Sequence, residues 1–327
     1  MITVWPNENY SQNPWLLTLF STLRAMELEV SGFRGISTVL SRPRLLIINW
    51  IESPLNKGSS HYIIALYRIF LLYLFKALKI KIIWVVHNIG PHDRKIGNFG
   101  KWYLRNVAAI SNGIIALNEE TTDLLSEAIC FPKDDLDCKC HFLPHGPYHV
   151  SIGNEDDHEI IYDFGFFGSV RPYKRVFPLI DEKRLLDVGN VIVVGEMVDG
   201  QQSKLKDKLC LEYGDKLQVV DRFTGNEEFV NLIRKCRTVV LPYTGNELNT
   251  GIGNLCASLG VPIIGADTPS LRQLIRDWGD SMVTTFDRHI EASVPARRSW
   301  KETFDIATKL ELTRRHGWKN IIDEYYY

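Results

Sequence analysis

The sequence predicts an α/β fold made of two doubly wound, Rossmann-like domains. The chain has 327 residues, and domains of roughly 150 residues make two of them the first expectation. Short apolar runs rich in Ile and Val alternate with helical segments along most of the chain. Most of these runs lack an alternation of apolar and polar residues, which is typical of strands buried on both faces of a parallel sheet.

The strand and helix segments can be placed in order. We expect strands at residues 45–49, 80–86, 113–116, 141–143, 160–167, 191–194, 217–220, 238–241 and 261–264. We expect helices at residues 15–28, 61–78, 100–109, 119–127, 226–236, 251–259 and 270–277. Strands that alternate with helices in this way favour parallel sheets with helices on both faces.

A polar, acidic segment at residues 150–159 separates the two strand–helix series and has the composition of a linker. We therefore expect domains at residues 1–150 and 158–300. A helical pattern in the tail, residues 301–327, predicts a helix that packs back across the domain join. Ligands of such folds bind at the carboxyl ends of the strands, so the residues just after each strand are the candidates for function.

Composition excludes several classes of protein. Lys and Arg number 38 and Asp and Glu 39, a net charge of -1, which argues against a nucleic-acid partner. Six Cys are too few for a disulfide scaffold, and residues 1–10 lack the basic start and apolar core of a secretory signal. These features predict a cytoplasmic protein. Cys138, Cys140 and His141 crowd together, but their spacing matches no common zinc pattern, so we expect no metal site.

Residues 63–86 form the most apolar stretch, but Arg68, Lys76, Lys79 and Lys81 interrupt it. It is therefore a poor membrane span. At helical spacing His61, Arg68 and Lys79 fall on one side, with Lys76 close by, and the rest of the surface is apolar. Two interpretations stay open: a helix packed on a sheet, or a helix that also touches the inner face of an anionic membrane through residues 61–81.

Titratable residues follow two of the strands predicted for the first domain. His87, His92, Asp93 and Arg94 come after the strand at 80–86, together with Asn88 and around Gly and Pro. So many titratable groups after an apolar strand favour a functional loop over a solvated turn. Glu52 follows the strand at 45–49, next to a Trp that could form a sugar platform. Glu52 fits an acid or base in the site and a surface carboxylate equally well.

Two segments of the second domain have the chemistry of an anion site. Gly168 ends the strand at 160–167, and Arg171 and Lys174 follow it as a pair of cations. Further on, Thr250 and Gly251 open a helix, and a Thr cap before glycines presents backbone N–H groups at the positive helix end. Both segments predict the binding of a phosphate or diphosphate. A dinucleotide fingerprint is incomplete here, which argues against NAD.

Several short motifs occur along the chain in a fixed order. They are Asn13-Pro14-Trp15, Asn49-Trp50-Ile51-Glu52, His87-Asn88-Ile89-Gly90-Pro91-His92, Leu143-Pro144-His145-Gly146-Pro147-Tyr148, Phe167-Gly168-Ser169-Val170-Arg171-Pro172-Tyr173-Lys174, Leu241-Pro242-Tyr243 and Thr250-Gly251. Taken together, these motifs resemble the GT-B glycosyltransferases of glycosyltransferase family 4, also called group 1. The resemblance is closest to exopolysaccharide and glycolipid glycosyltransferases that carry a His-Asn-x-x-Pro-His loop.

The resemblance implies two Rossmann-like domains that face a central cleft, an acceptor domain at residues 1–150 and a donor domain at residues 158–300. It implies transfer of a sugar from a UDP- or GDP-sugar to a saccharide or lipid-linked acceptor, in polysaccharide or glycoconjugate synthesis. It also implies a hexosyltransferase that uses neither a metal ion nor another cofactor.

The resemblance also implies roles for single residues. His87 would lie beside the donor sugar, and Glu247, the first Glu of the family's Glu-x7-Glu motif, would contact it. Leu255 stands at the second Glu position, so ribose contacts and the anomeric outcome stay open. Glu52 and Asp93 are the candidate bases if the reaction inverts. The expected surroundings are Gly168, Arg171, Lys174, Thr250 and Gly251 for the diphosphate, Asn88, His92, His145 and Asn249 for the sugar or acceptor, and Arg222, Phe223 and Thr224 for the base.

Two other functions remain as alternatives. One is a nucleotide-sugar epimerase of the same architecture, and the other is a non-catalytic binding or partner protein on a GT-B-like fold. Leu255 keeps the second alternative open. An epimerase needs paired acids, and conversion of a donor to its epimer without any acceptor would identify it.

Overall fold

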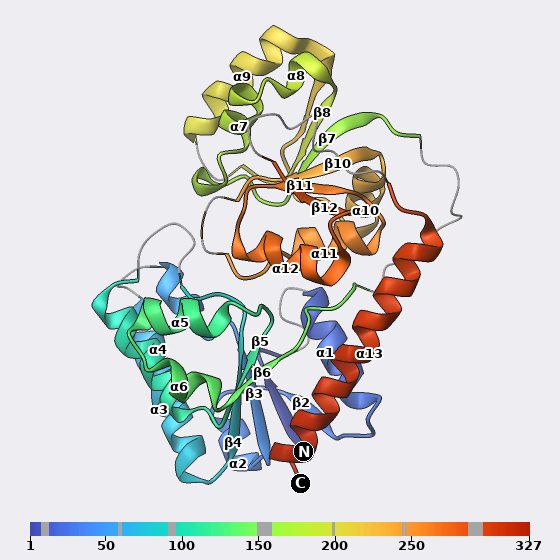
Figure 1. Cartoon of the computed structure of the whole chain (residues 1–327). Helices are drawn as coiled ribbons and strands as arrows, with labels where there is room; N and C mark the ends of the chain where they lie inside the picture. The colour runs from blue at the N-terminus through green and yellow to red at the C-terminus, as the bar shows by residue number, and fades with distance from the viewer. Residues whose placement is uncertain are drawn as a thin grey trace. The chain divides into compact units, whose positions relative to one another are not determined.

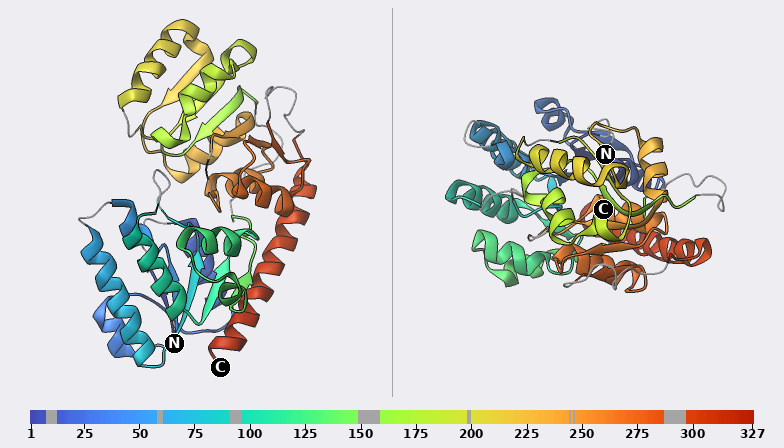
Figure 2. Two further views of the ribbon diagram at one scale, coloured as in Figure 1. Left: turned by 60° about the vertical axis from the view of Figure 1, so that its left-hand side comes forward. Right: turned by 90° about the horizontal axis from the view of Figure 1, so that it is seen from above.

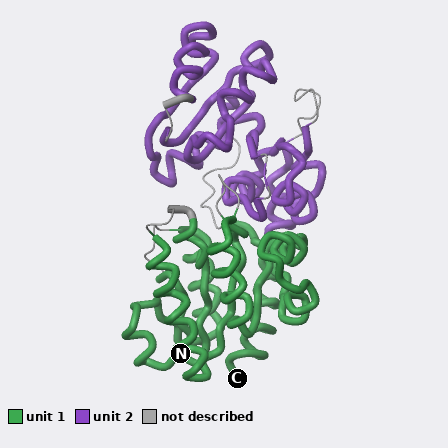
Figure 3. Tube along the Cα trace, turned by 90° about the vertical axis from the view of Figure 1, so that its left-hand side faces the viewer, with its two compact units in different colours: residues 1–148, 310–327 green, residues 149–309 purple. Residues whose placement is uncertain are grey.

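A computed structural model describes residues 1–7, 13–57, 61–90, 96–148, 159–197, 200–243, 245, 247–286 and 297–327. The predicted residues His92 and Asp93 lie outside this part of the chain. The chain divides into two compact units (Figure 3). Unit 1 is Met1–Tyr148 with Leu310–Tyr327, and unit 2 is His149–Lys309. Each unit contains a six-stranded parallel sheet (Figure 1).

The sheet of unit 1 has the strand order β2-β1-β3-β4-β5-β6, and every neighbouring pair is parallel. Its strands are almost wholly apolar because helices cover both faces. The strands are β1 (Ile2–Trp5), β2 (Val30–Gly32), β3 (Leu45–Asn49), β4 (Lys81–Val86), β5 (Gly113–Ala116) and β6 (Cys140–Phe142). The helices are α1 (Pro14–Arg24), α2 (Ile36–Ser41), α3 (Tyr62–Ala77), α4 (Asn98–Ile110), α5 (Thr121–Ile129) and α6 (Lys133–Asp137), with the turn η1 (Ser53–Lys57).

One face of this sheet packs against α1 and the end of α13 (Trp300–Tyr325), and α3 and α4 lie on the other side (Figures 1 and 2). Trp15 of α1 and Trp318 of α13 share a core with Ile47 of β3 and Ile83 of β4. Alternate strand residues therefore serve alternate faces, as the two-residue period of a strand requires.

The sheet of unit 2 has the order β12-β11-β10-β7-β8-β9 and is again parallel throughout. Phe177 of α7 and Leu209 of α9 pack on Phe166 and Val193 of the sheet. The strands are β7 (Tyr162–Phe167), β8 (Val191–Val194), β9 (Leu217–Val220), β10 (Cys236–Leu241), β11 (Ile263–Gly265) and β12 (Val283–Thr285). The helices are α7 (Val176–Glu182), α8 (Leu185–Val188), α9 (Gly200–Tyr213), α10 (Asn226–Arg234), α11 (Gly251–Ser258) and α12 (Pro269–Trp278), with the turns η3 (Pro172–Lys174) and η4 (Gly214–Lys216).

The predicted strands and helices all occur, with ends that differ by a few residues. The predicted helix 15–28 ends early, at Arg24, and the chain reverses at Glu27 with a left-handed backbone. The sequence did not predict β1, β2 and β12, or the helices α2, α6, α7, α8 and α9. Most of these are very short, and α9 is mainly polar, so they carry little apolar periodicity.

Arg68 corrects one expectation about the apolar segment. It does not join a basic side of α3 but turns inward, where Nη1 donates to the carbonyl of Ile51 at 3.0 Å and to Ser53 Oγ at 2.9 Å. Its guanidinium also lies 5.5 Å from the ring centre of Trp5.

Among the helices in the described part of the chain, none combines the length and the apolar character needed to cross a membrane.

Candidate functional site

Asn49, the last residue of β3, organises the carboxyl edge of the sheet in unit 1. Its Oδ1 accepts a hydrogen bond from Trp15 Nε1 at 3.1 Å and lies 3.1 Å from Nε2 of His87. Its Nδ2 donates to the carbonyl of Trp5 at 3.2 Å. Because the Asn49 oxygen can only accept, the Nε2 of His87 carries the ring proton. The Nδ1 of His87 is therefore the acceptor nitrogen of a neutral imidazole.

Aromatic rings enclose the imidazoles at this edge. Trp50 stacks on His87 with ring centres 4.3 Å apart, and Trp15 meets His87 edge-on at 5.1 Å. The ring of His145, which follows β6, lies 4.9 Å from that of Trp15. Burial lowers the pKa of His87 well below its usual value and that of His145 to about 4. Both imidazoles are therefore neutral at pH 7.

Glu52 belongs to the same edge and is not a surface carboxylate, since only 2% of its surface is exposed. Asn88 Nδ2 donates to Glu52 Oε1 at 3.3 Å, and Oε2 has no hydrogen-bond partner among the described residues. Burial raises the pKa of Glu52 to about 7, although the hydrogen bond from Asn88 and the charge of Arg68 act in the opposite direction. Glu52 can therefore take up or release a proton near neutral pH.

The turn that presents Glu52 is clamped from two helices. Tyr103 of α4 donates its hydroxyl to the carbonyl of Ile51 at 2.9 Å, and Arg68 of α3 donates to the same oxygen. Trp50 has φ 45, a left-handed conformation that is strained for a non-glycine residue. The clamp thus holds a strained turn in the position that aims Trp50 at His87 and buries Glu52.

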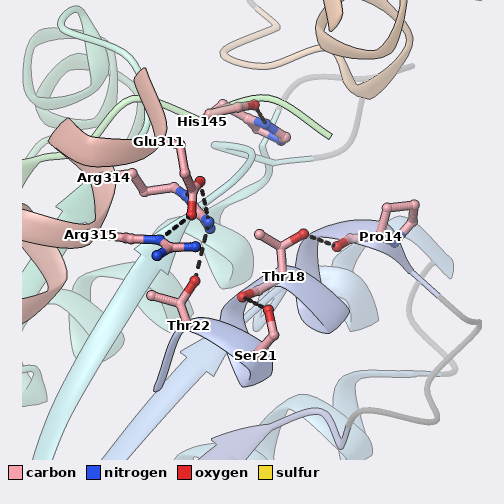
Figure 4. A network of polar contacts seen from close by, with 9 residues as sticks. Pro14, Thr18, Ser21, Thr22, His145, Glu311, Arg314 and Arg315 are labelled. Atoms are coloured by element: carbon pink, nitrogen blue, oxygen red, sulfur yellow. Dashed lines mark hydrogen bonds and ion pairs between the residues drawn. The ribbon is translucent and has the colours of Figure 1, made fainter. Parts of the chain in front are cut away.

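A buried ion pair within α13 is linked to α1 by a hydrogen bond from Arg314 to Thr22 (Figure 4). Arg314 of α13 is 1% exposed and donates to Glu311 Oε2 through Nε at 3.0 Å and Nη2 at 2.6 Å. Nη2 also donates to Thr22 Oγ1 of α1 at 3.1 Å. The charge of Arg314 contributes to the low pKa of His145. The protein itself therefore supplies the anionic partner of this cation, although Nη1 of Arg314 has no hydrogen-bond partner among the described residues.

The carboxyl edge of the sheet in unit 2 is built on close backbone approach. Gly168 follows β7 with φ 91, and a Cβ there would lie 3.6 Å from both Lys174 Nζ and Ile252 Cγ1. A Cβ on Gly195, after β8, would lie only 2.3 Å from the carbonyl oxygen of Gly168. Glycine at both positions lets the two loops meet beside Lys174 and the first turn of α11.

Lys174 brings a buried positive charge to this edge. It is 8% exposed, and its Nζ lies 5.6 Å from the ring centre of Tyr243. No hydrogen bond or ion pair reaches Nζ from the part of the chain that the structure describes. Burial lowers the pKa of Lys174 to about 8, helped by the charge of Arg171 and opposed by that of Glu247. Arg171 is exposed, and its Nε donates to Ser169 Oγ at 3.3 Å.

The N-terminus of α11 completes the edge. Thr250 Oγ1 caps it by accepting from the N–H of Gly253 at 3.1 Å, and it lies 3.4 Å from the hydroxyl of Tyr243. Glu247 is buried and accepts the N–H of Gly245 at 3.1 Å, and Asn249 lies in the loop before the cap. A capped helix end next to a buried ammonium group can hold a di-anion.

The residues expected near the base are less tightly tied to this edge. They follow β9, where Arg222 forms a two-bond ion pair with Glu228 at 2.9 and 2.5 Å and Phe223 is almost fully exposed. Thr224 is buried. No interaction between the described residues links these three to Lys174. Their role therefore stays a prediction.

The sequence motifs contained two residues whose importance was missed. Asn49 is the hub of one edge, and Tyr243 is the ring beneath Lys174. A polar Asn at the end of an otherwise apolar strand is the signal that could have identified the hub.

Within the described ranges, no group of three or more His, Cys, Asp or Glu could hold a metal ion.

No protein-family model matches the chain, and no curated protein sequence matches it. Solved structures do. HepE of Anabaena, solved with UDP and glucose, is 12% identical with a TM-score of 0.60, over 99% of this chain and 95% of that one. AviGT4, a glycosyltransferase involved in avilamycin A biosynthesis, is 12% identical with a TM-score of 0.57, over 99% and 96%. An α,α-trehalose-phosphate synthase from Burkholderia vietnamiensis is 7% identical with a TM-score of 0.56, over 88% and 75%.

The fold is GT-B. The two parallel sheets with their helices match those of GT-B glycosyltransferases, which confirms the fold class predicted from the sequence. Identities this low show the fold alone. That the two domains face a central cleft stays a prediction.

Proposed function

We propose that the chain is a metal-independent glycosyltransferase that moves a hexose from a UDP- or GDP-sugar to a saccharide or lipid-linked acceptor. The acceptor belongs to polysaccharide or glycoconjugate synthesis, as the resemblance of the motifs to glycosyltransferase family 4 suggests. The proposal includes a cytoplasmic location with peripheral membrane contact through residues 61–81. HepE, solved with UDP-glucose, gives a precedent for the donor on this fold.

The observation that carries the proposal is Lys174. A buried ammonium group without an anionic partner is costly, and a folded protein keeps one where a ligand supplies the missing charge. The capped start of α11 and the glycine backbone at Gly168 lie beside it. A nucleoside diphosphate has the charge and size that this edge lacks.

The same groups have a use in the reaction. When the glycosidic bond to the donor phosphate breaks, negative charge grows on the departing diphosphate and positive charge on the sugar carbon. Lys174, Arg171 and the N–H groups of α11 stabilise the departing diphosphate, which is the task a metal ion performs in other transferases. Glu247 is assigned to the hydroxyl groups of the donor sugar.

The edge of unit 1 is assigned to the sugar and the acceptor. His87 is neutral, with its proton on Nε2, and is assigned to the donor sugar. Trp50 adds an aromatic face of the kind that packs on sugar rings. If the reaction inverts, Glu52 removes the proton of the acceptor hydroxyl, because its pKa of about 7 suits a general base at neutral pH.

Calorimetric titration with UDP, GDP, ADP and CMP tests the donor site. We expect one diphosphate to bind, and Lys174→Ala to weaken its binding by roughly 30- to 100-fold, the loss of one charge-assisted contact in a buried site. Arg175→Ala is the matched control, because Arg175 is the next cation in the chain but pairs with Glu182. Its affinity should equal that of the native chain.

Three results would contradict the proposal. One is the absence of binding to any nucleoside diphosphate. Another is an unchanged affinity in Lys174→Ala. The third is conversion of a donor sugar to its epimer without an acceptor, which would make the chain an epimerase.

A further inference from the structure

The outward surface of α3 is apolar, the reverse of an ordinary surface helix. Ile63, Tyr67, Phe70 and Leu74 follow one another at spacings of four, three and four residues, which places them on one side of the helix. Ile63 is 76% exposed and Phe70 60% exposed. Helices at the surface of a globular protein normally carry polar groups on this side. The apolar side of α3 is therefore not explained by packing within the unit.

Neighbouring helices extend this apolar surface. A Cβ on Gly35, the cap of α2, would lie 4.0 Å from the hydroxyl of Tyr67, and Leu40 of α2 is 79% exposed. On the other side, Tyr62 stacks on Phe99 of α4 with ring centres 4.1 Å apart. We call the surface that these three helices share the outer face. Its exposed apolar residues are Ile36, Leu40, Tyr62, Ile63, Leu66, Tyr67, Phe70, Tyr73 and Trp102.

The segment that contains the outer face is strongly basic. Residues 30–118 hold 12 Lys and Arg and 2 Asp and Glu, which leaves 26 and 37 for the rest of the chain. The net charge of -1 thus hides a basic segment inside an acidic chain. Four exposed cations lie near the ends of these elements: Arg42 just after α2, Lys76 in the last turn of α3, Lys79 just after α3, and Lys81 at the start of β4. None of these four forms an ion pair with an acidic residue in the described ranges.

The positive charge near the outer face indicates which partner can bind there. Two copies of the chain packed face to face would bring like charges together, which disfavours a dimer. Exposed aromatic and aliphatic side chains with a basic margin are instead the combination that binds the surface of an anionic bilayer. We propose that the outer face docks on an anionic membrane, with Ile63 and Phe70 inserted among the lipids and Lys76 and Lys79 on the headgroups.

The face is tied to the edge that holds Glu52. Arg68, in the middle of α3, donates to the carbonyl of Ile51 and to Ser53, on either side of Glu52. Docking through α3 therefore holds the turn of Glu52 at a fixed position relative to the bilayer. The acceptor assigned to this arrangement is lipid-linked rather than a free saccharide. Both the docking, which specifies the membrane contact of the proposed function, and this choice of acceptor rest on that proposed function.

Co-sedimentation with lipid vesicles tests the docking. The full chain is mixed with vesicles of phosphatidylcholine alone, or with a third of the lipid replaced by phosphatidylglycerol. We expect the anionic vesicles to bind at least about tenfold more tightly. Ile63→Ser with Phe70→Ser should weaken that binding by about tenfold or more, because two apolar side chains no longer insert. Lys76→Gln with Lys79→Gln should cost about fivefold for each charge and remove most of the preference for anionic lipid.

Leu211→Ser on α9 is the matched control, since it removes an equally exposed Leu from unit 2. It should bind vesicles like the native chain, and all variants should keep the native melting temperature. The proposal is wrong if the native chain ignores anionic vesicles or if the Ile63 and Phe70 variant binds them normally. It is also wrong if sedimentation velocity finds a dimer that this variant dissociates. Nucleotide titration without vesicles reports on the donor site separately, so the two proposals can fail independently.

Discussion

The two units each bury one cation beside a carboxyl edge, and the two cations are treated differently. Arg314 in unit 1 is 1% exposed and donates three hydrogen bonds, two to Glu311 and one to Thr22. Lys174 in unit 2 is 8% exposed and has an aromatic ring beside it, with no ion pair to any described residue. The first cation joins two helices, and the second is the one that we propose to bind the donor diphosphate.

The comparison separates a charge that serves stability from one that serves binding. Burying a charge is tolerable only when another group compensates it. Where the protein supplies that group, as Glu311 does, the pair holds the fold together. Where it does not, the folded state keeps a charge that an anion can satisfy. The pKa of Lys174, lowered to about 8, reflects that uncompensated burial.

The largest expected effect on stability follows from removing each of the two charges in turn. Arg314→Met should lower the free energy of unfolding by about 3 kcal/mol, because Thr22 and Glu311 lose a buried partner. Lys174→Met should leave it unchanged or raise it, since an uncompensated charge disappears. Urea denaturation at neutral pH measures both.

Arg315→Met is the matched control for Arg314, because Arg315 pairs with the same Glu311 but is half-exposed. It should cost less than about 1 kcal/mol. Equal losses in the Arg314 and Lys174 variants would remove the distinction between the two cations.

A second effect concerns the pH dependence of stability and depends on Glu52. An unfolded Glu ionises near pH 4.5, whereas folded Glu52 keeps its proton up to about 7. Raising the pH through this window removes a proton from the unfolded chain first. The free energy of unfolding therefore falls, by up to about 3 kcal/mol, and the loss is complete above pH 7.

Glu52→Gln should abolish this part of the pH dependence, and denaturation between about pH 5 and pH 8 measures it. Glu228→Gln is the control. Its exposed carboxylate pairs with Arg222, which lowers the pKa of Glu228, so its titration lies below this window. Parallel slopes for the native and Glu52→Gln chains would show that Glu52 is ionised throughout.

The smallest effect tests whether the neutral imidazole of His87, at the carboxyl edge of unit 1, acts in the reaction rather than in binding the donor. His87→Ala should reduce turnover of the donor identified by titration by about 10²-fold, while its nucleotide affinity stays within a factor of two. His141→Ala is the control, because His141 is also in unit 1 but lies within β6 and contacts Tyr325 at the end of α13. A fully active His87 variant would take this residue out of the reaction.

Much of the fold could be predicted because parallel strands buried on both faces are continuous apolar runs. The runs of β3, β5, β8 and β9 were predicted with the ends that the structure has. The three-residue strands β2 and β12 could not be found, since their position is decided by the neighbours with which they pair. In the same way, the mainly polar helix α9 could not be predicted, because it shows little apolar periodicity although it packs on the sheet of unit 2.

The sequence by itself predicted the GT-B fold and the residues that we propose to bind an anion. Gly168 directly follows β7, Lys174 ends the short turn η3 after it, and Thr250 caps α11, so their positions are set by local pattern. Only the tertiary structure decided that Lys174 is buried without an ionic partner among the described residues, that Glu52 is buried rather than exposed, and that Arg68 turns inward to hold the Glu52 turn. These properties depend on which residues from distant segments surround a side chain. Burial and charge compensation are collective, so they exist only once the sheets and helices have packed.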